Sequence, residues 1–376
     1  MKALLVLEDG RTFEGKALGA RQNIAGEVVF NTSMTGYEEI MTDPSYRGQL
    51  VTMTYPLIGN YGLKGEDMES YEPHVSGFIV KEACRQPSHP QARENLDQYL
   101  QKREIPGIYD IDTRALTRHL RQEGCMYGMI AVSEGGEFNP DRLQQQARKQ
   151  AETKEDLVAQ VSSEEFWRLE GEQSRIAVMD FGVKYSILRY LNQLGAEVLV
   201  FPWDTKAEEI LDYDPDGVLL SNGPGDPRDL PGVLPEIEKL LGQQPMMGIC
   251  LGHQLLGLVF GGEIYKLKFG HHGGNHPVKN LENGQVVVTT QNHEYALKNE
   301  LAPEVRITHL NLNDQTIEGI RHKELPVYSL QYHPEGAPGP LDSEPVFQEF
   351  LQVVSDSSEV SHKFVQGFGS RSAAII

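Results

Sequence analysis

The stretch MMGICLGHQLLG, residues 246–257, passes from a short apolar run into a cysteine between two glycines and then into a helix-like pattern. Its centre, GICLG, has the form G-x-C-x-G, the thiol counterpart of a nucleophile elbow. A strand that turns this sharply into a helix needs small residues on both sides of the central one. Cys250 is therefore either a small buried hydrophobic residue, a common fate of free cysteine, or a nucleophile whose thiolate the helix N-terminus favours.

The segments around this corner alternate between two kinds of pattern. Short apolar runs such as RIAVMD (175–180), AEVLVFP (196–202) and DGVLLSNG (216–223) are separated by amphipathic stretches. Strands that alternate with helices predict right-handed βαβ units and a parallel sheet. GQVVVTTQNHEYAL (284–297) and ELPVYSLQYHPEG (324–336) indicate further strands, so we expect a mostly parallel or mixed sheet flanked by helices.

The first part of the chain is strand-rich. KALLVLEDGRTFEGKAL (2–18) predicts a hairpin about Asp9-Gly10, and QLVTMTYP (49–56) has the alternation of a half-buried strand. DTRALTRHLRQEG (112–124) predicts a helix capped by Asp112 and ended by Gly124. The fold class expected is α/β, with a β-rich α+β domain first. We predict this domain over 1–150, a polar linker over 151–173, the α/β domain over 174–355 and a flexible tail over 356–376.

Composition excludes several functions. The net charge of −20 repels phosphate backbones, so no nucleic-acid partner is expected. The 3 cysteines are too few and scattered for a disulfide framework, which favours a reducing, cytoplasmic location. The N-terminus has only a short apolar run before Glu8, which predicts neither a signal peptide nor a membrane span.

A thiol nucleophile needs a base, and His333 and Glu335 stand two residues apart at the end of an apolar run. Residues i and i+2 of an extended chain face the same way, so the carboxylate can orient the imidazole. Alone, this His-Pro-Glu is more simply a surface strand end. For the oxyanion, the backbone N–H groups of Gly225 and Leu251 are the expected donors, although GPGDP (223–227) is also an ordinary turn composition.

Two further motifs carry less weight. GRTFEGKA (10–17) nearly forms a phosphate-binding loop, but it lacks the hydroxyl residue after Lys16 and falls in a predicted hairpin, so we expect ATP to be bound elsewhere. GHHGGNH (270–276) has adjacent histidines and no cysteine, a poor zinc pattern. We expect a packed glycine-rich loop there and no metal.

The glycine-rich GPG turn, the G-x-C-x-G elbow and the His-Pro-Glu, in that order, resemble class I (triad) glutamine amidotransferases. The first half resembles the small chains of carbamoyl-phosphate synthases, in FNTSMTGYEEIMTDPSYRGQLVTMTYPLIGNYG (30–62) and GIYDIDTRALTRHLRQEG (107–124). KFGHHGGNHPVKN (268–280) is also typical of these chains. The resemblance extends from residue 1 to about 355.

The resemblance implies that glutamine is hydrolysed through a Cys250 thioester, with His333 and Glu335 completing the triad. Ammonia would pass to a large chain that makes carbamoyl phosphate from bicarbonate and ATP, for arginine or pyrimidine biosynthesis or both. No cofactor is implied on this chain, and ATP and Mg²⁺ are expected on the partner. L-glutamine would contact Ser45, Gly223, Gly225, Leu251, Gln254, Asn292, Glu294 and Tyr295. The family pattern has glycine where Glu294 stands, a costly exchange if that residue has a positive φ.

Three other functions fit parts of the sequence. A peptidase or esterase-like cysteine hydrolase would place its acid before the histidine and far from it, unlike Glu335. An inactive binding module would not need to retain Cys250, His333 and Glu335. The amidotransferase of a different synthase would not carry these first 150 residues. Release of glutamate from glutamine distinguishes the first two functions from that of a glutamine amidotransferase.

Overall fold

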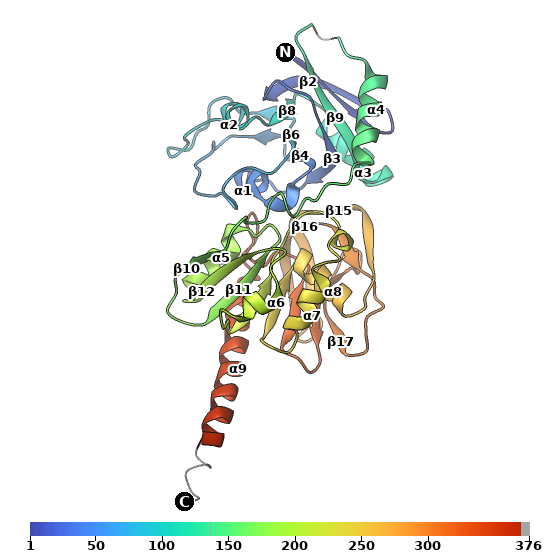
Figure 1. The fold of residues 1–376 in the computed structure, drawn as a ribbon. Helices are drawn as coiled ribbons and strands as arrows, with labels where there is room; N and C mark the ends of the chain where they lie inside the picture. Colours follow the sequence, from blue (N-terminus) through green and yellow to red (C-terminus); the bar gives the residue numbers. More distant parts are fainter. Residues whose placement is uncertain (136, 370–376) are drawn as a thin grey trace, which may run out of the picture.

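The computed structural model describes residues 1–135 and 137–369 of the chain. Two domains follow one another along the molecule, and the long helix α9 (Pro345–Gly369) extends from the second (Figure 1). The first domain is rich in strands, and the second combines a large sheet with helices. The expected fold class is confirmed.

The first domain is built around a closed barrel with strand order β1-β2-β8-β6-β4-β3-β9. The strands are β1 (Lys2–Leu7), β2 (Thr12–Gly19), β3 (Ile24–Asn31), β4 (Gln49–Met53), β6 (Gly77–Ile79), β8 (Pro106–Tyr109) and β9 (Met126–Ser133). The barrel closes because β1 pairs with both β2 and β9, which leaves no free edge. The predicted hairpin is confirmed, with Gly10 at φ 95° in its turn, and it excludes the phosphate-loop motif.

Strand β4 differs from its prediction as a half-buried strand, because all five of its residues are buried. Leu50 packs with the barrel core, whereas Val51 and Met53 pack with Ile40 and the other buried residues that lie outside the barrel. The outer face is thus covered by α1 (Tyr37–Thr42), η1 (Pro44–Tyr46) and α2 (Leu96–Lys102). A short two-stranded sheet, β5 (Leu57–Ile58) with β7 (Glu82–Ala83), completes this layer.

Two longer helices complete the first domain. In α3 (Thr113–Glu123), Asp112 accepts a hydrogen bond from the backbone N–H of Ala115, and Gly124 follows at φ 111°. Both predicted ends are therefore confirmed. Helix α4 (Pro140–Ala151) packs on β1, β3 and β9 through Leu143 and Ala147.

The second domain contains a ten-stranded sheet with order β10-β12-β11-β13-β14-β19-β18-β17-β15-β16. Strands β12 (Glu197–Pro202), β11 (Arg175–Asp180), β13 (Gly217–Leu220), β14 (Met246–Ile249) and β19 (Val327–Leu330) are parallel. The others are antiparallel: β10 (Trp167–Leu169), β18 (Ile317–His322), β17 (Val305–Asn311), β15 (Ile264–Asn280) and β16 (Val286–Leu297). The sheet is mixed, and its parallel centre carries the elbow.

Helices cover both faces of this sheet. Buried residues of α6 (Ala207–Leu211), α7 (Leu234–Leu240) and α8 (Leu251–Val259) join one core cluster. Those of α5 (Tyr185–Gln193) and the first turns of α9 join the other. Because parallel strands buried on both faces end at one edge, the side chains that follow them gather there. In Figure 1 this edge faces the first domain.

Three segments differ from the sequence expectations. The range 151–173, expected as a linker, includes buried Val158 and Val161 and strand β10, which pairs with β12. The stretch 270–276, expected as a loop, lies within β15, where two register shifts accommodate its glycines. The expected tail is helical as far as Gly369, and residues 370–376 lie outside the described residues.

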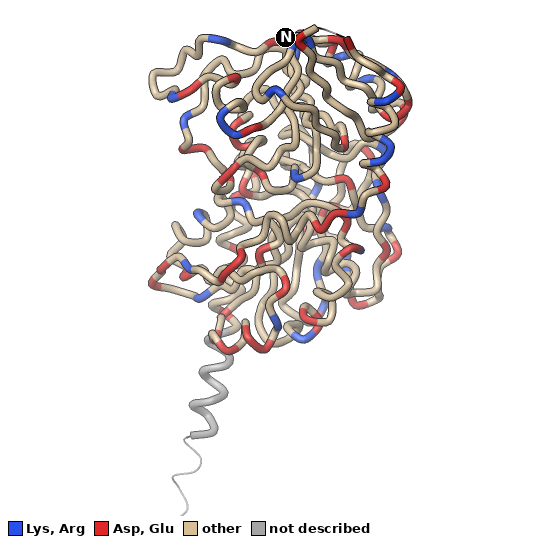
Figure 2. Tube along the Cα trace, turned by 45° about the horizontal axis from the view of Figure 1, so that its top comes forward, with Lys and Arg blue, Asp and Glu red and all other residues tan. Residues whose placement is uncertain are grey.

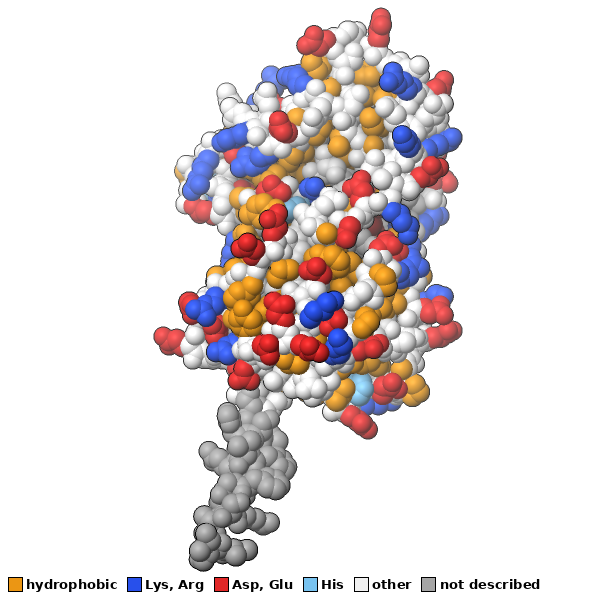
Figure 3. Space-filling view, viewed as in Figure 1, with side chains coloured by type: hydrophobic (Ala, Val, Ile, Leu, Met, Phe, Trp, Pro, Cys, Tyr) orange, Lys and Arg blue, Asp and Glu red, His pale blue; other side chains and the backbone are white. Residues whose placement is uncertain are grey.

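Basic and acidic residues are interspersed along the chain trace of both domains (Figure 2). The space-filling view shows acidic and basic side chains together around the waist between them (Figure 3). Among the described residues, none of the helices has the length and apolar character needed to cross a bilayer.

Candidate active site

Cys250 occupies the sharp corner between β14 and α8. Its backbone has φ 52° and ψ −102°, a conformation that is costly for a residue with a side chain and typical of functional turns. A side chain on either flanking glycine would collide with backbone: a Cβ on Gly248 would lie 2.7 Å from the Gly252 oxygen, and one on Gly252 2.2 Å from the Leu220 oxygen. The structure thus has the geometry that the G-x-C-x-G motif predicts. Cys250 is buried, with 2% of its surface exposed.

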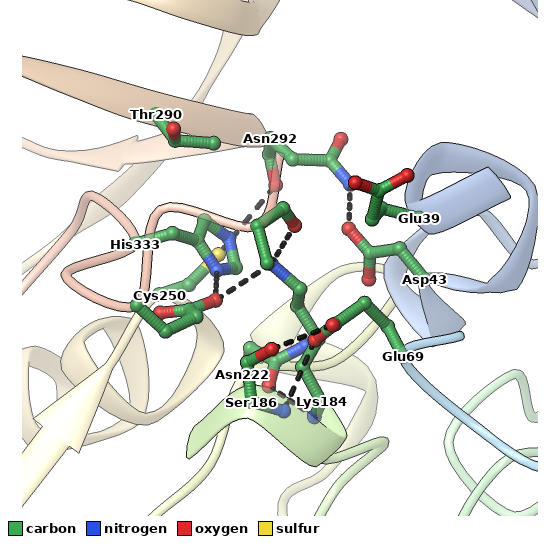
Figure 4. A network of polar contacts seen from close by, with 12 residues as sticks. Glu39, Asp43, Glu69, Lys184, Ser186, Asn222, Cys250, Thr290, Asn292 and His333 are labelled. Atoms are coloured by element: carbon green, nitrogen blue, oxygen red, sulfur yellow. Dashed lines mark hydrogen bonds and ion pairs between the residues drawn. The ribbon is translucent and has the colours of Figure 1, made fainter. Parts of the chain in front are cut away.

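His333 and Glu335 follow β19, the strand next to β14. The backbone N–H of His333 donates to the Thr290 oxygen at 2.9 Å, which fixes the base to strand β16. His333 Nδ1 lies 2.7 Å from Glu335 Oε1, and both side chains are almost fully buried. His333 Nε2 has no other hydrogen-bond partner, so it is the nitrogen available to the Cys250 sulfur (Figure 4). This is the base-and-orienter arrangement of a catalytic triad.

Lys184, which sequence reasoning missed, is the second partner of Glu335. Its Nζ donates to Glu335 Oε1 at 2.8 Å and also to the Ala337 oxygen, and only 1% of its side chain is exposed. Lys184 stands just after β11, so another strand end supplies it. In the sequence Lys184 stands four residues after the end of β11, in DFGVKYS (180–186), and no local pattern marks its distant partner.

The charges of this cluster support one another. Burial alone would lower the pKa of His333, but the charges of Glu335 and Cys250 outweigh it and raise this pKa to about 10. Burial alone would raise the pKa of Glu335, but Lys184 and His333 lower it to about 2. At neutral pH His333 is therefore an imidazolium beside an ionised carboxylate, which places a positive charge next to the Cys250 sulfur.

A small pocket beside the sulfur contains most of the predicted glutamine-binding residues. Ser45, Gly223, Gly225, Gln254, Asn292, Glu294 and Tyr295 line it together with Cys250. Leu251 is the one predicted residue outside this lining, although its backbone follows Cys250 directly. Gln49, Pro224, His272 and His293 also line the pocket, and sequence reasoning missed them.

The glycine-rich turn after β13 forms one wall of the pocket. A Cβ on Gly223 would lie 2.2 Å from the Phe181 oxygen, and Gly225 has φ 86°, so both positions require glycine. Gln254, on α8, donates to the Tyr295 oxygen at 2.9 Å and so connects the elbow helix with β16. This arrangement exposes backbone beside the nucleophile, as an oxyanion site requires.

The first domain closes the pocket from the opposite side. Asn222 Nδ2 donates to Ser45 Oγ at 3.0 Å. Asn292 Nδ2 donates to Asp43 Oδ2 at 2.8 Å (Figure 4). Deeper in the interface, Ser186 Oγ donates to Glu69 Oε1 at 2.6 Å. Loops of the first domain therefore contact the same residues that follow the strands of the second.

Glu294 occupies its position without backbone strain, because its φ is not among the positive values of the described residues. It is a strand residue of β16, and its Oε1 accepts a hydrogen bond from Gln49 Nε2 at 2.5 Å. The cost expected of a glutamate at positive φ does not arise.

One group of side chains has the composition of a metal site. His271, His293 and Glu318 are buried and offer ligand atoms within 4.8 Å of one another. Protein partners already engage most of these atoms: His271 Nε2 lies 2.8 Å from Asp314, and the two ring nitrogens of His293 lie 2.8 Å from the Tyr295 and Gln291 oxygens. These side chains therefore form a hydrogen-bonded network that supports strand β16.

Comparison with known proteins agrees with both halves of the structure. Residues 5–130 match the family described as carbamoyl-phosphate synthase small chain, CPSase domain, and residues 177–353 match glutamine amidotransferase class-I. The carbamoyl phosphate synthase small chain of Clostridium perfringens is 52% identical, covering 94% of this chain and 99% of the relative. The chain belongs to the carbamoyl phosphate synthase small chain family.

Other members of the family are similar over their whole length. The carbamoyl phosphate synthase small chain of Bacillus caldolyticus is 49% identical, covering 96% of this chain and 100% of the relative. The carbamoyl phosphate synthase pyrimidine-specific small chain of Bacillus subtilis is 48% identical, covering 95% of this chain and 98% of the relative. The chain is thus an amidotransferase subunit of a carbamoyl phosphate synthase.

Proposed function

We propose that this chain hydrolyses L-glutamine at Cys250 and supplies ammonia to a large carbamoyl phosphate synthase chain. The observation that carries the proposal is the buried arrangement of Cys250, His333 and Glu335 beside a pocket lined by polar groups. Small chains imply a large chain, and the large chain is where bicarbonate, ATP and Mg²⁺ would be used. The triad and the eight glutamine-binding residues named above are proposed in these roles.

The first half of the reaction forms a thioester. The Cys250 thiolate attacks the side-chain amide carbon, and backbone N–H groups of the Gly225 and Leu251 turns stabilise the oxyanion. The His333 imidazolium then donates its proton to the leaving nitrogen, so that the C–N bond breaks and ammonia departs. Glu335 keeps the imidazole oriented throughout and stabilises its protonated form, and Lys184 keeps Glu335 ionised.

The second half regenerates the enzyme. Neutral His333 removes a proton from water, the resulting hydroxide attacks the thioester carbon, and collapse of the intermediate expels the Cys250 thiolate with glutamate as product. The product ammonia would be consumed by the large chain. The name of the Bacillus subtilis relative supports pyrimidine biosynthesis as a destination, and arginine biosynthesis is the other one proposed.

The deciding experiment compares two nitrogen sources in the complex of this chain with its large chain. Cys250→Ser should abolish glutamine-dependent synthesis of carbamoyl phosphate, because a serine hydroxyl is a far weaker nucleophile than a thiolate. Ammonia-dependent synthesis should persist, which shows that the variant is folded and assembled. Glutamine-dependent synthesis near the wild-type rate would mean that Cys250 is not the nucleophile.

A further inference from the structure

Glu294 lies in a wall that two cavities share. The inner one is the pocket beside Cys250, which has a free volume of about 20 Å³. The outer one, of about 360 Å³, lies between the domains. Both are lined by Gln49, Pro224, Gly225, Glu294 and Tyr295. A molecule that approaches Cys250 from the outer cavity must therefore pass the Glu294 side chain.

The carboxyl groups of Glu294 and Glu27 lie beside a single ammonium, that of Lys266. Lys266 Nζ lies 2.7 Å from Glu27 Oε1 and is engaged there. Glu294 Oε1 accepts a hydrogen bond from neutral Gln49, and no ion pair to Glu294 is found among the described residues. Two carboxylates thus share one ammonium. Burial and the charge of Glu27 raise the pKa of Glu294 well above its usual range, so the free site favours the neutral acid, and a cation that binds beside it would favour the carboxylate.

The substrate itself brings a cation. L-glutamine carries an α-ammonium and an α-carboxylate at the end opposite its amide, and the amide carbon must reach Cys250. The backbone turn at Gly223 and Gly225 and the Ser45 hydroxyl line the same pocket and suit the anionic oxygens. Glu294 is the carboxylate in that lining and suits the ammonium.

Building on the proposed function, we propose that the Glu294 side chain binds the α-ammonium of glutamine and makes a free α-amino group a requirement of this site. The carboxylate would add a contact to the ammonium that the backbone atoms of this position cannot make. Gln49, from the first domain, holds the carboxylate at the wall of the pocket until substrate arrives.

The test compares two amides in the full chain. L-glutamine carries the α-ammonium, whereas glutaramate (4-carbamoylbutanoate) keeps the amide and the carboxylate and lacks it. Glu294→Gln should raise KM for glutamine at least tenfold with little change in kcat, because the contact is made in the ground state and the transition state alike. The preference for glutamine over glutaramate, as a ratio of kcat/KM, should fall at least tenfold. The exposed Glu14→Gln on β2 is the matched control and should change neither quantity.

Two further measurements make the result decisive. Glu294→Gly removes the whole side chain, and a preference equal to that of the wild type in either variant would overturn the proposal. Calorimetric binding of both amides to full-length Cys250→Ser chain, with and without Glu294→Gln, repeats the comparison without turnover. Absence of glutamine hydrolysis by the wild-type complex would then count against the proposed function alone, while the binding ratio would still decide the role of Glu294.

Discussion

Asn292 donates its side-chain amide to Asp43 across the boundary between the two domains, at a distance of 2.8 Å. The backbone oxygen of the same Asn292 accepts from Cys250 Sγ at 3.6 Å. One residue thus connects the first domain to the nucleophile. The β-barrel domain is therefore a part of the catalytic pocket rather than an appendage to it.

Removing this contact should impair catalysis without unfolding the chain. Asp43→Ala leaves the Asn292 amide without its buried acceptor, and hydrogen bonds to charged groups contribute about 1.5–3 kcal/mol. We expect kcat/KM for glutamine hydrolysis to fall at least tenfold. The exposed Glu14→Ala on the same domain should have no effect, and an unchanged kcat/KM in Asp43→Ala would show that the contact is dispensable.

The two polar members of the triad should differ in their importance. His333→Asn removes both proton transfers, and acid–base groups contribute at least about 10²-fold to rate. Glu335→Gln removes only the group that orients and charges the imidazole, so the glutaminase rate should fall less. Steady-state glutamate release measures both, and a larger loss in Glu335→Gln than in His333→Asn would contradict the assigned roles.

The raised pKa of His333 also predicts a pH dependence of stability. A group whose pKa is higher in the folded chain stabilises it fully below the unfolded value of 6.5, and this contribution declines as pH rises toward the folded value of about 10. The slope is at most about 1.4 kcal/mol per pH unit.

The measurement is best made in the Cys250→Ser chain, which has no thiol at this position to titrate. Urea unfolding at pH 6.5, 7.5 and 8.5 should show Cys250→Ser losing stability relative to Cys250→Ser/Glu335→Gln as the pH rises, because Glu335 is the chief charge that raises the pKa of His333. A difference between the two chains that stays constant over this range would mean that His333 is not charged by Glu335.

Lys184 should be important for stability as well as for the triad. Its pKa is raised because the charges of Glu335 and Glu69 outweigh burial, which would lower it. Lys184→Met leaves buried carboxylates without their ammonium, and breaking a buried pair in this way costs about 3–5 kcal/mol. Lys16→Met removes an exposed pair to Asp110, with both side chains more than half exposed, and should lower the unfolding free energy far less. Equal losses of unfolding free energy in the two variants would contradict the buried network.

The features predictable from sequence are those set by neighbouring residues. The Asp9-Gly10 hairpin, the caps of α3, the Cys250 elbow and the His333–Glu335 pair each depend on residues within a few positions. Lys184 and Asp43 were missed because their partners lie 151 and 249 residues away, and no local pattern marks such contacts.

The errors had similar physical causes. Strand β4 alternates like a half-buried strand, but both of its faces are buried: helices cover Val51 and Met53, and Thr52 lies on the side of Leu50, which packs in the barrel core. The segment 356–376 was expected to be a flexible tail because its pattern is weak. The helix that precedes it packs Phe347, Phe350 and Val354 into the second domain's core, and this helix continues to Gly369.

The contacts between the domains give a route by which a partner can control the glutaminase. Ser45 and Asp43 follow α1 in the first domain, and both are hydrogen-bonded to residues beside the nucleophile, Asn222 and Asn292. A large chain that binds the first domain and favours one position of this loop would favour the competent pocket, provided that it binds that state more tightly.

We expect the isolated chain to bind glutamine and turn it over slowly, and its glutaminase rate to rise on addition of the large chain. In Ser45→Ala the rise should be smaller, because the contact with Asn222 is lost. Equal glutaminase rates of the wild-type chain with and without the large chain would rule this coupling out.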